Sequence, residues 1–362
     1  MSNLRIAGPT PLPPPVLKAG SKQMINHRGS VYEAIQSRVV KNLQHFFQTN
    51  NHLYILTSSG TGALEASITN FFSRGETIIS LSVGVFGDRW ADIGLAYGAK
   101  VIKIPSVFGK SIDWAKFISI LKKNPKTKGV LVTHNETSTG VLNDVGKVSK
   151  ILKLNAPEAL LLVDGISSLG GVDLPMDKLG IDTLASASQK AWMAPPGLSF
   201  IAVSNRAWKR VQKSDMPRYY FDLRMAEEFA LKNQTPATPA VGILQSLDIS
   251  LELMKKEGRR EIFKRHIEQM KYFRSGVGKL GLQLLVSDMN ASPTVTSIVV
   301  PSSIDAKNWL SLLNTKYGVV LSGGMGQLKG KIIRVAHMGY CSKADLDGVL
   351  NALDKSVKTL SK

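Results

Sequence analysis

Six short apolar runs alternate with stretches of helical periodicity in the first half of the chain, and this alternation constrains the fold more than any other feature. The apolar runs are typical of buried strands and span residues 53–56, 77–81, 101–104, 129–133, 160–163 and 183–186. The helical stretches lie near residues 62–72, 87–97, 113–123 and 145–154. Alternating strands and helices form a mostly parallel sheet with helices on both faces. The sequence therefore predicts an α/β fold.

The segments before the alternation predict an arm and a long helix. Residues 7–15 are rich in proline, which disfavours helices and central strands, so we expect an extended arm there. Apolar residues then recur at helical spacing from Val31 to Phe47. We place an N-terminal arm over residues 1–17 and the start of a large domain at residue 18.

The pattern changes in the last third of the chain. Residues 240–275 are strongly helical apart from a break at Gly258. Two later strands and a closing helix are predicted at residues 294–300, 331–335 and 343–358. A chain of 362 residues also favours two domains over one. We therefore predict a large domain over residues 18–257 and a smaller α+β domain over residues 258–362.

Charge and cysteine content exclude several classes of protein. The net charge is +19, but the basic residues are spread along the chain, so nucleic-acid binding is not the expected primary function. The single cysteine, Cys341, excludes an intrachain disulfide or a cysteine-cluster zinc site, and we predict no metal. No apolar run reaches the ~18 residues of a membrane span. Residues 1–5 lack the apolar core of a secretory signal, so we expect a cytoplasmic protein.

The segment from Thr57 to Ala66 is the first of four candidate site features. It runs from a strand through a turn of Gly, Ser and Thr into a helix, whose N-terminal N–H groups can bind a phosphate. It lacks the lysine motif of a nucleotide P-loop. The alternative is an ordinary helix cap, since Ser and Thr are preferred there.

Asp164 is the second feature, because it follows directly on the apolar run that ends at Val163. In an α/β sheet, ligands bind outside the carboxyl ends of the strands. A buried carboxylate needs a partner, and a protonated pyridine nitrogen would provide one. The alternative is an aspartate that caps the following turn.

Lys190 and Arg334 complete the set. Lys190 follows a strand of small residues, and a lysine amine can form a Schiff base when its surroundings lower its pKa. The alternative is a solvated loop lysine. Arg334 interrupts an apolar strand, where its planar guanidinium could hold a substrate carboxylate or a structural ion-pair partner. Together the four features are the parts of a pyridoxal-phosphate site.

The chain resembles the class V, fold-type I pyridoxal-phosphate aminotransferases, and in particular the alanine–glyoxylate and serine–pyruvate (serine–glyoxylate) group. The matching stretches run in order from the arm to the smaller domain. They are Gly8-Pro9 with Pro11, Ser59 to Ala66, Gly84 to Arg89, Thr133 to Gly140, Leu162 to Asp164 and Leu169 to Gly171, Gly180 to Asp182, Ser188 to Ala191, Ala194 to Gly197, and Gly330 to Arg334. The resemblance implies a large domain built on a mostly parallel seven-stranded sheet.

The resemblance also implies the two catalytic residues and the substrate contacts. Lys190 would bind the cofactor aldehyde as a Schiff base and later move the Cα proton. Asp164 would pair with the pyridine nitrogen and keep it protonated. Arg334 would bind the substrate α-carboxylate, with Gly8 of the arm beside the substrate.

Further contacts to pyridoxal 5′-phosphate follow from the same comparison. The phosphate would be held by Ser59, Gly60, Thr61 and Gln189, and by Thr238 of the partner subunit in a homodimer. Phe86 and Ile166 would cover the two ring faces, and the Thr137 hydroxyl would approach the ring oxygen. Phe86 replaces a tryptophan that is frequent in this group. Some relatives have tyrosine in place of Thr235, whose role stays open.

The expected reaction is ping-pong transamination from alanine or serine to glyoxylate or pyruvate. We see one carboxylate-binding arginine, Arg334, and no clear second one; an arginine such as Arg28 brought in by the fold would undermine this substrate preference. Close alternatives are phosphoserine and ureidoglycine aminotransferases. A cysteine desulfurase would need a reactive cysteine, and Cys341 is badly placed for that role. The alternative outside enzymes is a basic nucleic-acid-binding protein on the same fold.

Three other positions have plain interpretations. His27-Arg28 lies either near the site entrance or in a surface turn before the Val31 helix. His134 is interpreted as a structural or supporting histidine, and Met254 as a core residue.

Overall fold

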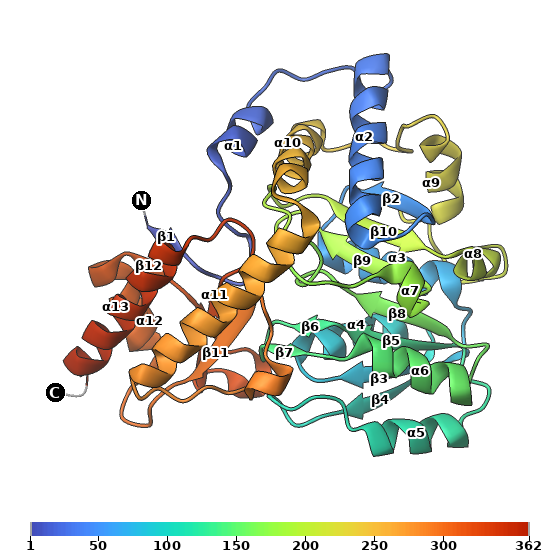
Figure 1. Ribbon diagram of the computed structural model, residues 1–362. Coiled ribbons are helices and arrows are strands. Elements are labelled where there is room, and N and C mark those ends of the chain that lie inside the picture. The colour runs from blue at the N-terminus through green and yellow to red at the C-terminus, as the bar shows by residue number, and fades with distance from the viewer. Residues whose placement is uncertain (1, 361–362) are drawn as a thin grey trace.

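The computed structural model describes residues 2–360, so Met1 and the last two residues of the predicted smaller domain lie outside it. Its centre is a seven-stranded sheet with the strand order β2-β10-β9-β8-β5-β3-β4 (Figure 1). The strands are β2 (His52–Leu56), β3 (Thr77–Ser82), β4 (Lys100–Pro105), β5 (Gly129–Thr133), β8 (Leu160–Asp164), β9 (Thr183–Ala187) and β10 (Ser199–Val203). All six strands predicted from apolar runs are therefore present.

Only β10 runs against the other strands, because it pairs antiparallel with both β2 and β9. This confirms the mostly parallel sheet of seven strands. The apolar run of β10 went unrecognised in the residue pattern. It follows β9 without an intervening helix, so the alternation that identified the other strands does not extend to it.

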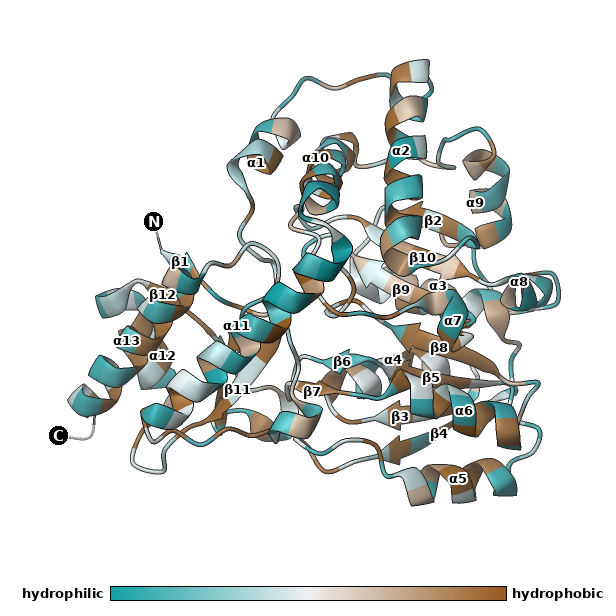
Figure 2. Ribbon diagram, viewed as in Figure 1, coloured by the Kyte–Doolittle hydropathy of each residue, from teal (hydrophilic) through white to brown (hydrophobic). Residues whose placement is uncertain are grey.

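Helices cover both faces of the sheet, as predicted. On β8, Leu161 joins one apolar cluster while Leu160 and Leu162 join the cluster on the other face, as the two-residue period of a strand requires. Figure 2 shows the apolar strands enclosed by helices with polar outer faces. The main covering helices are α2 (Ser30–Phe47), α3 (Gly60–Phe71), α4 (Val85–Ala96), α5 (Trp114–Lys123), α6 (Val145–Asn155) and α10 (Val241–Glu257).

The prediction of an extended arm over residues 7–15 is wrong at its end. Helix α1 (Pro14–Gly20) begins with two prolines in its first turn. Proline is accepted there because the first N–H groups of a helix have no partner within the helix. The arm before α1 crosses to the C-terminal part of the chain, where β1 (Asn3–Leu4) pairs with β12 (Val319–Val320).

The C-terminal part begins after the predicted break. Gly258 has a φ of +86° and separates α10 from α11 (Arg259–Lys279). A three-stranded antiparallel sheet follows, with the order β11-β14-β13. Its strands and helices are β11 (Val295–Val299), β13 (Ser322–Gly323), β14 (Ile332–Ala336), α12 (Ala306–Tyr317) and α13 (Lys343–Leu360). The boundary at residue 257 stays a prediction, as do the other domain limits.

The remaining short elements connect these layers. They are β6 (Asn135–Glu136), β7 (Val141–Leu142), α7 (Met176–Leu179), α8 (Asn205–Val211) and α9 (Leu223–Ala230). Across residues 2–360, no helix combines the length and the apolar character that crossing a membrane requires. The cytoplasmic location expected from the sequence stays a prediction.

Candidate active site

A cavity of about 260 Å³ lies at the carboxyl ends of the central strands. The structure brings together here most of the residues that the resemblance implied for the cofactor. The lining consists of Ser59, Gly60, Thr61, Leu64, Phe86, Arg89, Asn135, Thr137, Asp164, Ile166, Ser167, Gln189 and Lys190. Leu64, Arg89, Asn135 and Ser167 are additions that sequence reasoning did not assign to the site.

The N-terminus of α3 forms one wall of the cavity. Ser59 occupies the N-cap position with extended backbone, but its side chain makes no capping hydrogen bond. Its hydroxyl is therefore not used in the way the ordinary cap interpretation requires. Gly60 must be small, because a Cβ there would lie 2.5 Å from Cδ1 of Ile166. Free N–H groups, hydroxyls and a close backbone approach together suit a phosphate.

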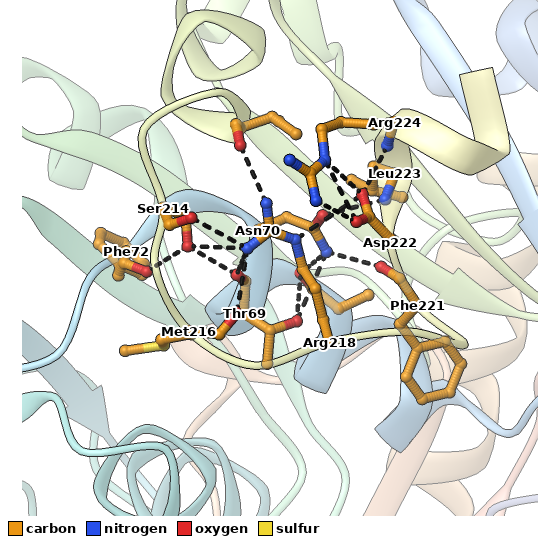
Figure 3. Close-up of polar contacts among 12 residues, drawn as sticks. Thr69, Asn70, Phe72, Ser214, Met216, Arg218, Phe221, Asp222, Leu223 and Arg224 are labelled. Carbon is orange, nitrogen blue, oxygen red and sulfur yellow. Dashed lines mark hydrogen bonds and ion pairs between the residues drawn. The ribbon is translucent and has the colours of Figure 1, made fainter. Parts of the chain in front are cut away.

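The other end of α3 is anchored by a polar cluster (Figure 3). Asn70 donates from its amide to the Phe221 carbonyl at 2.7 Å and accepts from the Leu223 N–H at 3.0 Å. Arg218 donates to the Thr69 carbonyl at 3.1 Å, and the carboxylate of Asp222 lies 3.7 Å from its Nε. These contacts fix the helix whose opposite end faces the cavity.

Asp164 ends β8 with its side chain buried. One carboxylate oxygen accepts from the Ile166 N–H at 2.9 Å, and the other lies 3.5 Å from the Thr133 hydroxyl. Burial raises the pKa of Asp164 to about 7, and the charge of Glu136 adds to the rise. The turn-capping interpretation is thus correct for one oxygen, while the second has only a distant partner.

Lys190 extends into the same cavity and is not a solvated loop residue. Burial lowers its pKa to about 8, and the positive charges of Arg334 and Arg89 lower it further, against the attraction of Asp164. Its ammonium donates to the carbonyl of Ala7 in the arm. Gly8 packs directly on Lys190, since a Cβ at Gly8 would lie 2.6 Å from the lysine Nζ.

Arg334 lies on β14 of the three-stranded sheet and is buried. It makes no ion pair with a residue of the described chain, contrary to the structural alternative. Its Nε donates to the Gly323 carbonyl at 2.9 Å and its Nη1 to the Thr137 carbonyl at 2.8 Å. The arginine is held next to Thr137 by backbone oxygens, and the residues described provide no hydrogen bond to Nη2.

Two charged residues at the site were missed by sequence reasoning. Arg89, one turn after Phe86 on α4, lines the cavity and places its guanidinium 4.9 Å from the centre of the Phe86 ring. Glu136, next to Thr137, is fully buried and accepts from N–H groups of α4. The sequence signal for both was their place in the matched stretches 84–89 and 133–140, where they received no role.

Thr238 lies outside this cavity, on an exposed loop. Arg28 reaches the same loop, where its guanidinium donates to the carbonyls of Thr235 at 2.6 Å and Pro236 at 3.1 Å. Within its own chain, Arg28 therefore holds this loop and does not line the cavity, whereas Arg89 does. The Thr235 hydroxyl donates to the carbonyl of Ala237 and so shapes the same loop.

The supporting residues have structural surroundings. His134 is buried, and its Nδ1 lies 2.9 Å from the Ser168 hydroxyl. Met254 is in the core, as predicted. Cys341 is also buried, and burial raises its pKa to about 11. A thiol held so far from its thiolate form is unsuited to the nucleophilic role of a desulfurase cysteine.

The cavity has the polar groups that pyridoxal phosphate needs. The N-terminus of α3 offers free N–H groups and hydroxyls, Lys190 offers an amine, and Asp164 offers a carboxylate oxygen with only a distant partner. The lining therefore fits a ligand with a phosphate, an aldehyde and a protonated ring nitrogen.

The chain belongs to the aminotransferase class-V family, whose model matches residues 3–347. It is an aminotransferase of fold type I, and its cofactor is pyridoxal phosphate. Solved relatives share the whole fold. An alanine–glyoxylate aminotransferase from Nostoc sp. is 28% identical, with a TM-score of 0.94 over 98% of this chain and 95% of that one.

Relatives with higher sequence identity are named for different functions. The soluble hydrogenase 42 kDa subunit of Anabaena cylindrica is 39% identical over 97% of this chain and 92% of its own length. The L-aspartate–glyoxylate aminotransferase of Paracoccus denitrificans is 34% identical over 96% of this chain and 89% of its own length. The family is thus established, whereas the substrate is a separate question.

Proposed function

We propose that this aminotransferase moves the amino group of a small amino acid, alanine or serine, to glyoxylate or pyruvate. The observation that carries the proposal is the convergence of Lys190 and Asp164 on a small cavity backed by Arg334, with the N-terminus of α3 at its wall. Similarity to relatives named for serine–glyoxylate and alanine–glyoxylate transfer supports the same choice.

The chain's own groups have distinct tasks in this reaction. When bound, pyridoxal phosphate supplies an aldehyde for the amine and a protonated ring that accepts electrons. Ser59, Thr61 and Gln189 would hold its phosphate, and Asp164 would accept the ring N–H. An aspartate with a raised pKa is stabilised as the carboxylate by such a cation. Phe86 and Ile166 would enclose the ring.

Lys190 moves the proton. Its pKa of about 8 leaves an appreciable fraction of neutral amine near neutral pH, as a base at Cα requires. Arg334 would bind the α-carboxylate through its remaining N–H groups, and Thr137 lies beside it. Fixing the carboxylate orients the Cα–H bond toward the lysine. Because the first oxo acid leaves before the acceptor binds, while the amino group stays on the loaded enzyme, we expect ping-pong kinetics.

A homodimer is part of the proposal. Thr238 is exposed and does not line the cavity of its own chain, consistent with a hydroxyl that reaches the phosphate in a second copy of the chain. Exposed Tyr219 and Tyr220 lie beside a second cavity lined in part by Thr235 and Pro236. Exposed aromatic side chains of this kind are typical of protein interfaces.

A visible absorption spectrum tests the function. The purified protein with bound cofactor should absorb in the visible range, lose that band on addition of L-alanine or L-serine, and regain it with glyoxylate or pyruvate. The donor that reduces the band faster identifies the preferred substrate. A band that responds to none of these donors would reject the proposed substrates and leave the aminotransferase class intact.

Arg89 favours a second candidate, a donor with a side-chain carboxylate. It lines the cavity and has no ion pair or side-chain hydrogen bond among the described residues. A free guanidinium at a substrate cavity suits a second carboxylate. L-Aspartate added to the same absorption assay distinguishes the candidates. Faster bleaching by aspartate than by alanine, lost in Arg89→Gln, would replace the first proposal by this one.

A further inference from the structure

Glu136 is a buried carboxylate that the proposed reaction does not use directly. Its side chain is fully inaccessible to solvent, on the short strand β6 next to Thr137 of the cavity wall. Burial raises its pKa, whereas its hydrogen bonds to Ser138, Gly87 and Phe86 oppose the rise. Burying a carboxylate is expensive, so its partners deserve an explanation.

Those partners are the first N–H groups of α4. One carboxylate oxygen accepts from the N–H groups of Phe86 and Gly87, each at 3.1 Å. The other accepts from the hydroxyl of Ser138 at 2.6 Å and from its N–H at 3.1 Å. The Val85 N–H donates in turn to the Ser138 hydroxyl at 3.0 Å. The start of α4 is therefore satisfied by a carboxylate from another segment, which also suits the helix dipole.

The backbone at Gly84 lies directly against this pair of side chains. A Cβ at Gly84, the N-cap of α4, would lie 2.5 Å from Cγ of Glu136 and 2.4 Å from the Ser138 hydroxyl. The loop and the helix start are thus in direct contact. Phe86, which forms one wall of the cavity, sits on the first turn that Glu136 holds.

The same loop also holds the arginine. The Thr137 carbonyl accepts from Arg334, and Glu136 is the acidic residue whose charge stabilises the Arg334 guanidinium. The negative charge of Glu136 also acts on Asp164. One carboxylate therefore contacts the helix of the ring-covering residue and acts electrostatically on both the aspartate and the arginine.

We infer that Glu136 is a positioning residue: it sets the place of Phe86 over the cofactor ring and supplies the negative charge that balances Arg334 in the substrate-free site. The role given to Arg334 rests on the proposed function, whereas the contact with α4 does not. A glutamine at this position keeps the size but provides one acceptor oxygen for donors that now use two. It also removes the charge.

Two measurements without any substrate test this inference. The first is hydrogen exchange at the Phe86 and Gly87 amides in the cofactor-free protein, which should become faster in Glu136→Gln. The second is a pH titration of the visible band of the bound cofactor. Besides Glu136, the charged groups near that chromophore are Asp164, Lys190, Arg334 and Arg89, and the charge of Glu136 acts on Asp164 and Arg334 of this set. Removing the negative charge of Glu136 disfavours the protonated form, so the midpoint should move to lower pH by roughly half a unit or more.

Variants separate charge from geometry. Glu136→Asp keeps the charge on a shorter side chain, so it should retain the titration midpoint and still weaken cofactor binding. Glu136→Gln should raise the dissociation constant for pyridoxal phosphate roughly tenfold. If Glu136→Gln does not fold, Ser138→Ala serves in its place, because it removes one donor to the same carboxylate. In the Ser138→Ala protein, the Phe86 and Gly87 amides should exchange faster, and the titration midpoint should stay unchanged.

Asp182→Asn is the matched control. Asp182 is equally buried and accepts from the Leu161 N–H at 2.8 Å, but it lies at the amino end of β9, away from the cavity. The Asp182→Asn substitution should lower stability and change neither the titration midpoint nor the cofactor affinity. If amide exchange, midpoint and affinity in Glu136→Gln all equal those of the wild type, the inference is overturned. Failure of every amino donor in the wild type would instead reject the proposed function, because none of these readouts uses a substrate.

Discussion

Two buried aspartates at opposite ends of neighbouring strands have very different surroundings. Asp164 follows β8 at the carboxyl end of the sheet, and Asp182 precedes β9 at the amino end. Asp182 accepts from the Leu161 N–H, from the Ser204 hydroxyl at 2.9 Å and from Arg206 at 2.5 Å. Asp164 has one good hydrogen bond and a raised pKa.

The cavities beside the two aspartates differ in the same way. The cavity at the amino end is the larger, about 390 Å³ against about 260 Å³, and Asp182 and Arg206 line it as an ion pair. The smaller cavity contains Lys190 and Arg89 without ion-pair partners among the described residues. Charged side chains without ion-pair partners, and not size, therefore distinguish the candidate site from the cavity at the amino end of the sheet.

The most severe test of this comparison is Lys190→Ala. The fold should persist, because the lysine lines a cavity and is not part of the apolar core. Transamination should fall by ~10³-fold or more, since the covalent partner and proton carrier are both lost. Steady-state rates with the best donor measure the loss. Turnover close to the wild-type value would contradict the role assigned to Lys190.

The next largest effect is expected at the two aspartates. Asp164→Ala should reduce kcat by ~10²-fold or more and leave some cofactor bound, because the ring nitrogen loses its partner while the phosphate contacts remain. Asp182→Ala should leave kcat unchanged and lower the free energy of unfolding by about 2–3 kcal/mol, through loss of charge-assisted hydrogen bonds. Kinetics and denaturant unfolding of both variants decide whether the two ends differ as described.

Arg334→Lys should have a smaller, specific effect. A lysine keeps the charge but loses the fork that holds a carboxylate, so we expect KM for amino acid and oxo acid substrates to rise ~10-fold with a modest change in kcat. An amine without a carboxylate serves as control, since its KM should not respond. Equal changes for both kinds of donor would remove Arg334 from the substrate site.

The pH dependence of cofactor-free stability tests the surroundings of Asp164 without any substrate. The pKa of Asp164 is raised in the folded state to about 7 from an ordinary value of 3.8, so the folded protein binds the extra proton between these limits. Its contribution to stability is therefore present at low pH and is lost as the pH rises from about 4 to about 7. Buried His134, His266 and His337, whose pKa values are lowered to about 4, 4 and 3, change stability in the opposite direction over the same range. The decline should therefore appear in the difference between the free energies of unfolding of the wild type and Asp164→Asn, measured by denaturant unfolding.

Local patterns predicted much of the fold. Strands β3, β5 and β8 were recognisable because each is a short apolar run between helical stretches, and α2 because its apolar residues repeat at helical spacing. The start of α1 was not, because a proline in the first turn of a helix resembles a proline in an extended segment. β10 was missed because it follows β9 with no helix between them, so the alternation of strands and helices did not mark it. Its place in the sheet comes from antiparallel pairing with β2 and β9.

The site residues also fall into those that local patterns predicted and those that they did not. Lys190, Asp164 and the α3 turn stood out because each directly follows a predicted strand, where ligands of α/β sheets bind. Arg89 and Glu136 did not, because a charged residue on a helix or in a loop is usually solvated. Only the folded chain places Arg89 at the cavity and buries Glu136 beneath the start of α4.

The sequence by itself determined the alternation of strands and helices, the family, and the residue types that chemistry with pyridoxal phosphate requires. The tertiary structure alone decided which charges are paired and which are left free. Ser322 and Gly323 reach Arg334 only through the pairing of β13 with β14, and the Thr137 carbonyl reaches it from the segment after β6. Electrostatic environment depends on distances between residues far apart in the chain, and local sequence patterns do not contain those distances.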